Sequence, residues 1–192
     1  MLEIGAAPPI LTLALARREL DVKAVDIDPA RFAETIAAYD LTIAGCDIET
    51  EPLPFADRAF DVVILNEVLE HLRINPVFTL REARRALRDG GTLLLSTPNL
   101  RSLNGIRNLL VHGRSYAVAN NLYEEYEKLE RVGHMGHVRE YAPGDVKDLL
   151  GRVGFDVTEL IFRSRQRNAF AEAICRVRPE FRRDVSYVAR AV

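Results

Sequence analysis

The pattern of apolar and polar positions begins with a compact strand–helix–strand unit. Residues 2–4 form a very short apolar strand, and residues 5–9 form a turn of small and rigid residues. Apolar positions then recur at helical spacing over residues 10–20, which predicts an amphipathic helix. A second strand over residues 22–25 ends on Asp26. This order predicts a βαβ unit of the kind that binds nucleotides.

The rest of the chain continues the alternation of strands and helices. We expect further strands over residues 41–46, 60–65, 92–96, 155–162 and 184–191, and helices over residues 29–39, 67–72, 77–87, 143–153 and 169–177. Asp89-Gly90-Gly91 is expected to end the helix at 77–87 as a C-cap turn. The alternation predicts an α/β, Rossmann-like three-layer sandwich with seven strands. The last two strands lack a full crossover helix packed in the usual way, so we expect a mostly parallel sheet with an antiparallel last strand.

Residues 101–133 interrupt this rhythm with two helical stretches where a short connection would suffice. Long insertions after the carboxyl end of a strand are often lids or substrate-selecting elements. A structural decoration of the sheet edge is the alternative. We treat residues 1–192 as one domain that carries this helical insertion, a candidate lid.

Composition narrows the class of protein. The chain has 192 residues, a net charge of −2 and only two cysteines, Cys46 and Cys175, which are too few for a disulfide framework. A reducing cytoplasm is therefore the expected location. No apolar run approaches the roughly 20 residues of a membrane span. Near-neutral charge makes nucleic acid an unlikely partner, although arginines gather after residue 162.

The first unit also contains candidate ligand-binding groups. Backbone N–H groups at the start of the first helix can hold an anionic group, and the Asp26 carboxylate can accept hydrogen bonds from two ribose hydroxyls. Glu3 lies inside a strand, where an acid is costly without a partner, and a cationic ligand would supply one. Ala7 and Pro9 obstruct the close backbone approach that a dinucleotide pyrophosphate needs.

Several motifs together resemble the class I S-adenosylmethionine-dependent methyltransferases. Glu3-x-Gly5 resembles their motif I, although Ala7 and Pro9 replace its later glycines, and Leu53-Pro54-Phe55 with Phe60-Asp61-Val62-Val63 resembles the family's LPF…FDVV. The resemblance covers residues 1 to 162 and implies S-adenosyl-L-methionine as cofactor. It implies ribose binding by Asp26, contact of Asp47 with the adenine amino group and packing of Ile48 on the ring. The implied cofactor-binding residues are Glu3, Gly5, Ala7, Asp26, Ile27, Asp47, Ile48 and Asn66.

Family members usually have a helical segment before the first strand, whereas Met1 falls directly on that strand here. We expect that this N-terminal helix is missing because the chain lacks its true N-terminus. The other possibility is an unusually open pocket.

The segment Glu67-Val68-Leu69-Glu70-His71 is a candidate catalytic or metal-binding motif. On a helix, Glu67, Glu70 and His71 would share one face. EVLEH resembles the acidic motif of the ubiquinone-pathway O-methyltransferases and that of the small-RNA 3′-terminal 2′-O-methyltransferases, in which a distant histidine completes a divalent-metal site. His137 is that candidate here, and the bound ion would be Mg²⁺, Mn²⁺ or Zn²⁺. Without a metal, His71 and His137 remain candidate catalytic bases.

Substrate-binding candidates follow the insertion. We expect His134, Arg139 and Tyr141 to form one wall of an acceptor pocket. The alternative for the last two is an ion pair and a core aromatic.

Three functions are compatible with this pattern. The first is a methyltransferase for a small-molecule acceptor, with oxygen as the expected atom. The second is a metal-dependent RNA terminal 2′-O-methyltransferase, and the third is a degenerate cofactor-binding module without activity. The sequence does not indicate the acceptor or the oligomeric state.

Overall fold

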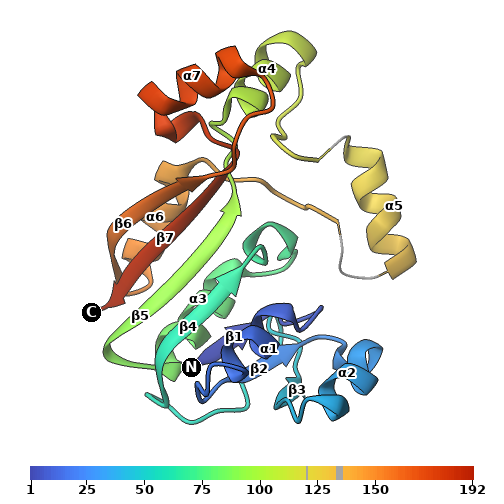
Figure 1. Ribbon diagram of the computed structural model, residues 1–192, viewed down its shortest axis with the longest axis vertical. Helices are drawn as coiled ribbons and strands as arrows, with labels where there is room; N and C mark the ends of the chain where they lie inside the picture. The colour runs from blue at the N-terminus through green and yellow to red at the C-terminus, as the bar shows by residue number, and fades with distance from the viewer. Residues whose placement is uncertain (120, 133–135) are drawn as a thin grey trace.

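A twisted seven-stranded sheet forms the centre of the protein (Figure 1). This computed structural model describes residues 1–119, 121–132 and 136–192. In spatial order β3-β2-β1-β4-β5-β7-β6, the strands are Ile43–Gly45, Lys23–Asp26, Leu2–Ile4, Phe60–Asn66, Leu87–Pro98, Asp184–Ala191 and Phe155–Arg163. Strand β7 runs antiparallel to both neighbours, and the other pairings are parallel. The predicted α/β sheet with an antiparallel last strand is confirmed.

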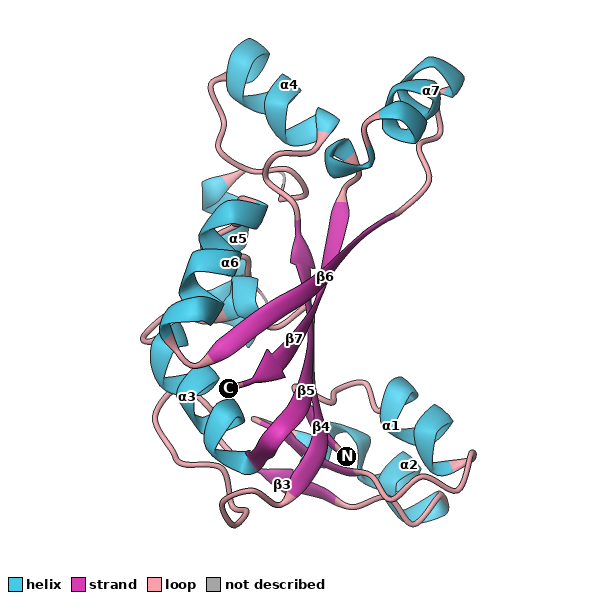
Figure 2. Ribbon diagram, turned by 90° about the vertical axis from the view of Figure 1, so that its left-hand side faces the viewer, coloured by secondary structure: helices cyan, strands magenta, loops and turns pink. Residues whose placement is uncertain are grey.

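Helices cover both faces of the sheet, so the three-layer prediction is confirmed as well (Figure 2). Helices α1 (Ile10–Ala16) and α2 (Ala33–Ala38) lie on one face, and α3 (Pro76–Ala86) and α6 (Pro143–Arg152) lie on the other. The insertion contains two helices, α4 (Leu103–His112) and α5 (Leu122–Val132), as its pattern predicts. The remaining elements are α7 (Ala169–Val177) and the 3-10 turns η1 (Pro29–Phe32), η2 (Leu69–His71) and η3 (Pro179–Phe181).

The two halves of the sheet are covered unequally. On the face opposite α6, none of the described helices lies over β5, β7 and β6 (Figure 2). Leu94 and Ile161 are consequently exposed, by 37% and 40%. Alternate side chains of the same strands, among them Leu93, Leu95 and Tyr187, point to the covered face and are buried.

The predicted helix C-cap at residues 89–91 is wrong. Helix α3 ends at Ala86 and strand β5 begins at once with Leu87, which is fully buried and pairs with Phe60 of β4. Burial of Leu87 in the core favours extension of the strand over a capped turn. Gly90 (φ +70°) belongs to an irregularity in that strand, where the pairing register shifts between residues 60 and 62.

Candidate active site

The turn after β1 requires glycine at its first position. Gly5 has a φ of +79°, a conformation that side chains disfavour. A Cβ atom there would lie 2.4 Å from Cγ2 of Val68, which follows β4. The amides of Gly5 and Ala6 both donate to the carbonyl of Val25, at 2.9 and 3.2 Å. The glycine therefore lets the ends of β1, β2 and β4 approach one another closely.

The Asp26 carboxylate fixes this arrangement from the end of β2. Its Oδ2 accepts from the amide of Ala7 at 2.9 Å, and its Oδ1 accepts from the amide of Asp28 at 3.0 Å. The side chain is only 8% exposed, yet it lines a cleft at the carboxyl edge of the sheet. Each carboxylate oxygen has more than one acceptor site, so the group can still receive hydrogen bonds from a ligand.

This cleft has a volume of about 240 Å³ and opens where parallel strands end. Six of the eight predicted cofactor-binding residues line it, namely Gly5, Ala7, Asp26, Ile27, Asp47 and Ile48. The cleft also has ten lining residues outside that prediction, Pro8, Arg31, Phe32, Cys46, Glu49, Glu67, Val68, His71, Leu72 and Arg73. Of these, Glu67 and His71 were expected as metal-binding or catalytic groups.

The two other predicted cofactor-binding residues do not line the cleft. Glu3 is 5% exposed, and its carboxylate accepts a hydrogen bond from the hydroxyl of Thr12 in α1. Burial raises the pKa of Glu3, against the opposing effect of the Thr12 hydrogen bond. Asn66 is engaged by Ser96, whose hydroxyl donates to Oδ1 at 2.5 Å. Among the described residues, the hydrogen-bond partner of the Glu3 carboxylate is thus the Thr12 hydroxyl.

Glu49 has a structural role that sequence reasoning missed. Its buried carboxylate accepts from the amides of Arg73 and Ile74, at 2.5 and 2.6 Å, and from Nε of Arg73 at 3.2 Å. These bonds join the loop after β3 to the loop after β4 across one side of the cleft. No local pattern in the sequence indicates a pairing over 24 residues.

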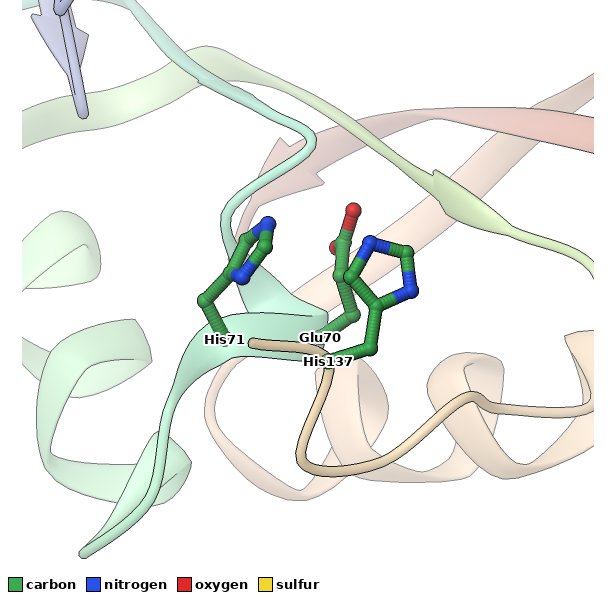
Figure 3. Close-up of side chains that lie close together, drawn as sticks. All are labelled: Glu70, His71 and His137. Atoms are coloured by element: carbon green, nitrogen blue, oxygen red, sulfur yellow. The ribbon is translucent and has the colours of Figure 1, made fainter. Parts of the chain in front are cut away.

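A second cluster adjoins the cleft where the loop after β4 meets the segment after α5. Figure 3 shows the side chains of Glu70, His71 and His137 gathered there. One potential ligand atom from each lies within 4.8 Å of the others. The centroids of the two imidazole rings are 4.8 Å apart, and the rings meet edge to face. The predicted association of His71 with the distant His137 is thus present in the fold.

In both imidazole rings, Nδ1 faces a hydrogen-bond acceptor oxygen. Nδ1 of His71 lies 3.0 Å from the carbonyl of Gly136, and a carbonyl can only accept, so this nitrogen carries the proton. Nδ1 of His137 lies 3.3 Å from Oε1 of Glu140 and is oriented likewise. In the neutral rings, the basic lone pair therefore belongs to Nε2.

Glu70 is an acid without solvent exposure. The Thr97 hydroxyl donates to its Oε2 at 2.9 Å, whereas Oε1 has no hydrogen-bond partner among the described residues. Burial, followed by repulsion from Glu67, raises the pKa of Glu70 to about 8. Burial lowers the pKa of His137, but the Glu140 hydrogen bond and the charge of Glu70 outweigh it and raise that pKa. The orphaned oxygen suits a proton or a cation.

The predicted helical face shared by Glu67, Glu70 and His71 is wrong. Only Leu69–His71 forms a 3-10 turn, and Glu67 has a φ of +55°. The close approach of Val68 to Gly5 bends the chain at this point. Glu67 lines the cleft instead, where its Oε1 lies 2.9 Å from the Ser96 hydroxyl oxygen, and it is not a member of the described three-residue cluster.

Two buried carboxylates attach the insertion to this cluster. Glu140 accepts from the amides of Ala117, Val118 and Ala119, at 2.5 to 3.2 Å, while it also contacts His137. Glu125 of α5 accepts from the amide of His137 at 2.8 Å. Burial raises the pKa of Glu140, but the bonds from His137 and the three amides outweigh this effect and lower it. The site and the insertion are thus held by the same groups.

The predicted substrate wall has a mixed outcome. His134 lies outside the described residues. Tyr141 is 6% exposed and belongs to the hydrophobic core, and the Arg139 guanidinium lies over its ring at 5.1 Å. Neither residue lines the cleft.

None of the helices in the described residues has the length and apolar character needed to cross a membrane.

Comparisons with known proteins agree with the geometry. Residues 2–95 match a family described as a methyltransferase domain. The ubiquinone biosynthesis O-methyltransferase of Pseudomonas aeruginosa (strain UCBPP-PA14) is 28% identical over 160 residues, a match that covers 79% of this chain. This chain spans 66% of the length of that relative, just under two thirds.

Solved structures have the same fold at low sequence identity. An S-adenosylmethionine-dependent methyltransferase from Mesorhizobium loti has a TM-score of 0.64 at 18% identity, over 98% of this chain and 89% of that protein. The [4+2]-cyclase SpnF has a TM-score of 0.67 at 16% identity, over 99% of this chain and 74% of that protein. The cyclase illustrates that this fold alone does not determine a reaction. The matching domain covers residues 2–95, and this match, the sheet order and the acid-lined cleft at the strand ends all agree with the resemblance of this chain to the class I S-adenosylmethionine-dependent methyltransferases.

Proposed function

We propose that this protein transfers the methyl group of S-adenosyl-L-methionine to an oxygen atom of a small-molecule acceptor. The observation that carries the proposal is the cleft with Asp26 at the end of β2 and Asp47 and Ile48 after β3. The Asp26 carboxylate would receive the ribose hydroxyls, and Asp47 would receive the adenine amino group. Ile48 would pack against the purine.

The acceptor side of the site is the Glu70, His71 and His137 cluster. Transfer of a methyl group from a sulfonium to a hydroxyl oxygen forms an O–C bond and breaks the S–C bond, and the hydroxyl proton must leave. Nε2 of His71 is the basic atom at the cleft, because its Nδ1 proton is committed to Gly136. His71 is therefore the proposed base, and His137 would stabilise the charge beside it.

The same cluster also fits a divalent cation. Glu70 Oε1 is buried without a partner among the described residues, and Nδ1 of both imidazoles faces an oxygen acceptor, as in many metal sites. Glu70, His71 and His137 would hold the ion, which would supply positive charge that favours loss of the acceptor proton. Two imidazoles and one carboxylate suit Mn²⁺ or Zn²⁺ better than Mg²⁺.

Isothermal titration calorimetry with S-adenosyl-L-methionine tests the cofactor part of the proposal. We expect binding by the intact chain and weaker binding by Asp26→Asn, with Asp28→Asn as the matched control. The titration is repeated with EDTA and with Mn²⁺, Zn²⁺ or Mg²⁺. Absence of binding in all conditions would support the degenerate module instead.

Methyl transfer from labelled cofactor then tests the acceptor class. Phenolic and other hydroxyl-bearing small molecules are compared with a short RNA that has a free 3′ end. Transfer to the RNA alone would favour the terminal 2′-O-methyltransferase. Loss of transfer in His71→Gln with unchanged cofactor affinity is expected if His71 is the base. We further propose that the protein acts in the cytoplasm, consistent with its two free cysteines.

A further inference from the structure

One end of the molecule differs from the rest in charge. Residues 101–118 and 163–184 contain ten arginines and three acidic residues, whereas the whole chain has a net charge of −2. The three acids, Glu172, Glu180 and Asp184, each pair with a neighbouring arginine of the same region. The two segments are therefore strongly cationic and the remainder of the protein is acidic.

The fold brings these two segments together. Both views place α4 and α7 at the same end of the molecule, beyond the points where β5 and β6 end (Figures 1 and 2). The amide nitrogen Nδ2 of Asn99 donates to the carbonyls of Glu180 and Arg182, at 2.9 and 2.8 Å. The guanidinium of Arg101 also lies 6.0 Å from the centre of the Phe181 ring. We call residues 101–118 together with 163–184 the arginine end.

The arginine end also exposes large apolar side chains. They lie in α4 and α7 and are between 58% and 79% exposed, namely Leu109, Leu110, Val111, Phe170 and Val177. A cluster of such residues among cations is unusual for a surface that faces only water. Helices that combine arginines with exposed leucine and phenylalanine are typical of segments that lie in the interface of a bilayer.

We propose that the arginine end docks on an anionic membrane surface. Arginines would contact lipid phosphates, and the apolar side chains of α4 and α7 would enter the acyl boundary. RNA also carries phosphates, but it gives exposed leucine and valine side chains no apolar environment, so the composition favours lipid. Docking requires no spanning helix. It is independent of the proposed methyl transfer.

Vesicle flotation with the full chain tests this proposal. We expect the protein to float with vesicles that contain phosphatidylglycerol and to remain unbound with vesicles of pure phosphatidylcholine, with binding reduced in high salt. Arg165→Gln together with Arg167→Gln should weaken binding by about five-fold per arginine removed. Leu110→Ser with Phe170→Ser should weaken it at least as much, whereas Ile10→Ser, exposed by 71% on α1, should not.

Four outcomes would overturn the proposal. The first is equal binding to both vesicle types, and the second is unchanged binding in both double variants. The third is tight binding of a single-stranded RNA oligomer by a chain that does not float, which would assign the arginines to nucleic acid. Circular dichroism of each variant verifies folding. If Leu110→Ser with Phe170→Ser does not fold, the flotation of Arg165→Gln with Arg167→Gln alone tests the proposal. The fourth outcome is a dimer in sedimentation velocity that Leu110→Ser and Phe170→Ser abolish, without flotation, which would assign the surface to a second copy.

Discussion

The proposed site has a cofactor side, the cleft, and an acceptor side, the Glu70, His71 and His137 cluster with the groups that hold it, and the two are built in different ways. The cofactor side consists of strand ends and the first residues of the loops that follow, joined by backbone amides and by the carboxylates of Asp26 and Glu49. The acceptor side depends on buried carboxylates that attach the helical insertion, such as Glu140, which accepts from the amides of residues 117–119. Substitutions on the cofactor side should therefore change ligand binding and turn geometry. Substitutions on the acceptor side should change how firmly the insertion is attached.

The largest effect is expected at the β1 turn of the cofactor side. Gly5→Ala adds a Cβ at a φ of +79° and at 2.4 Å from Cγ2 of Val68. Strain and overpacking should lower the free energy of unfolding by about 3 kcal/mol, with loss of cofactor binding. Gly144→Ala is the control, since nothing lies within 4 Å of its added Cβ. Equal urea midpoints for the two variants would show that the turn is not constrained as described.

Asp26→Asn should follow in magnitude and should act on binding. The loss of a charged acceptor for the ribose hydroxyls should weaken cofactor affinity by about 1.5–3 kcal/mol, as calorimetry would measure. Asp28→Asn should retain the affinity, because Asp28 supplies only its backbone amide to Asp26. An undiminished affinity in Asp26→Asn would mean that the ribose is held elsewhere.

Glu140→Gln tests the acceptor side. In this variant an NH₂ group replaces one carboxylate oxygen of residue 140 and faces the backbone N–H groups of residues 117–119, which are also donors. The lost hydrogen bonds should lower the free energy of unfolding by about 1–2 kcal/mol. Hydrogen exchange should become faster at residues 117–119, while affinity for the cofactor stays nearly constant. Glu130→Gln on the exposed face of α5 is the control. A fall in cofactor affinity equal to that in Asp26→Asn would remove the distinction between the two sides.

The smallest effect concerns Glu172, which joins α7 to Arg182. The hydrogen bonds from Arg182 lower the pKa of Glu172 to about 2. Because the folded-state pKa is depressed, the contribution to stability is complete above about pH 4.5 and is lost as the pH falls toward 2. The urea midpoints of the intact protein and Glu172→Gln should differ at pH 7 and converge near pH 2. A constant difference between the midpoints across this range would contradict the assignment.

Six of the eight residues predicted from the sequence for cofactor binding line one cleft, because their positions at the strand ends follow from local patterns. The strand that ends on Asp26 and the strand before Asp47 both have apolar runs, and parallel strands end at one edge. Glu49 and Glu140 could not be found in the same way, since their partners are distant in sequence and a lone glutamate has no periodicity. Glu67 was misplaced because the helical spacing of the motif does not reveal the close contact of Val68 with Gly5.

The most direct test of the account is a crystal structure of this protein with S-adenosylhomocysteine. We predict that the ribose hydroxyls lie within hydrogen-bond distance of the Asp26 carboxylate and that the purine lies against Ile48, beside Asp47. A nucleoside bound elsewhere, or a cleft that stays closed at saturating ligand, would contradict it.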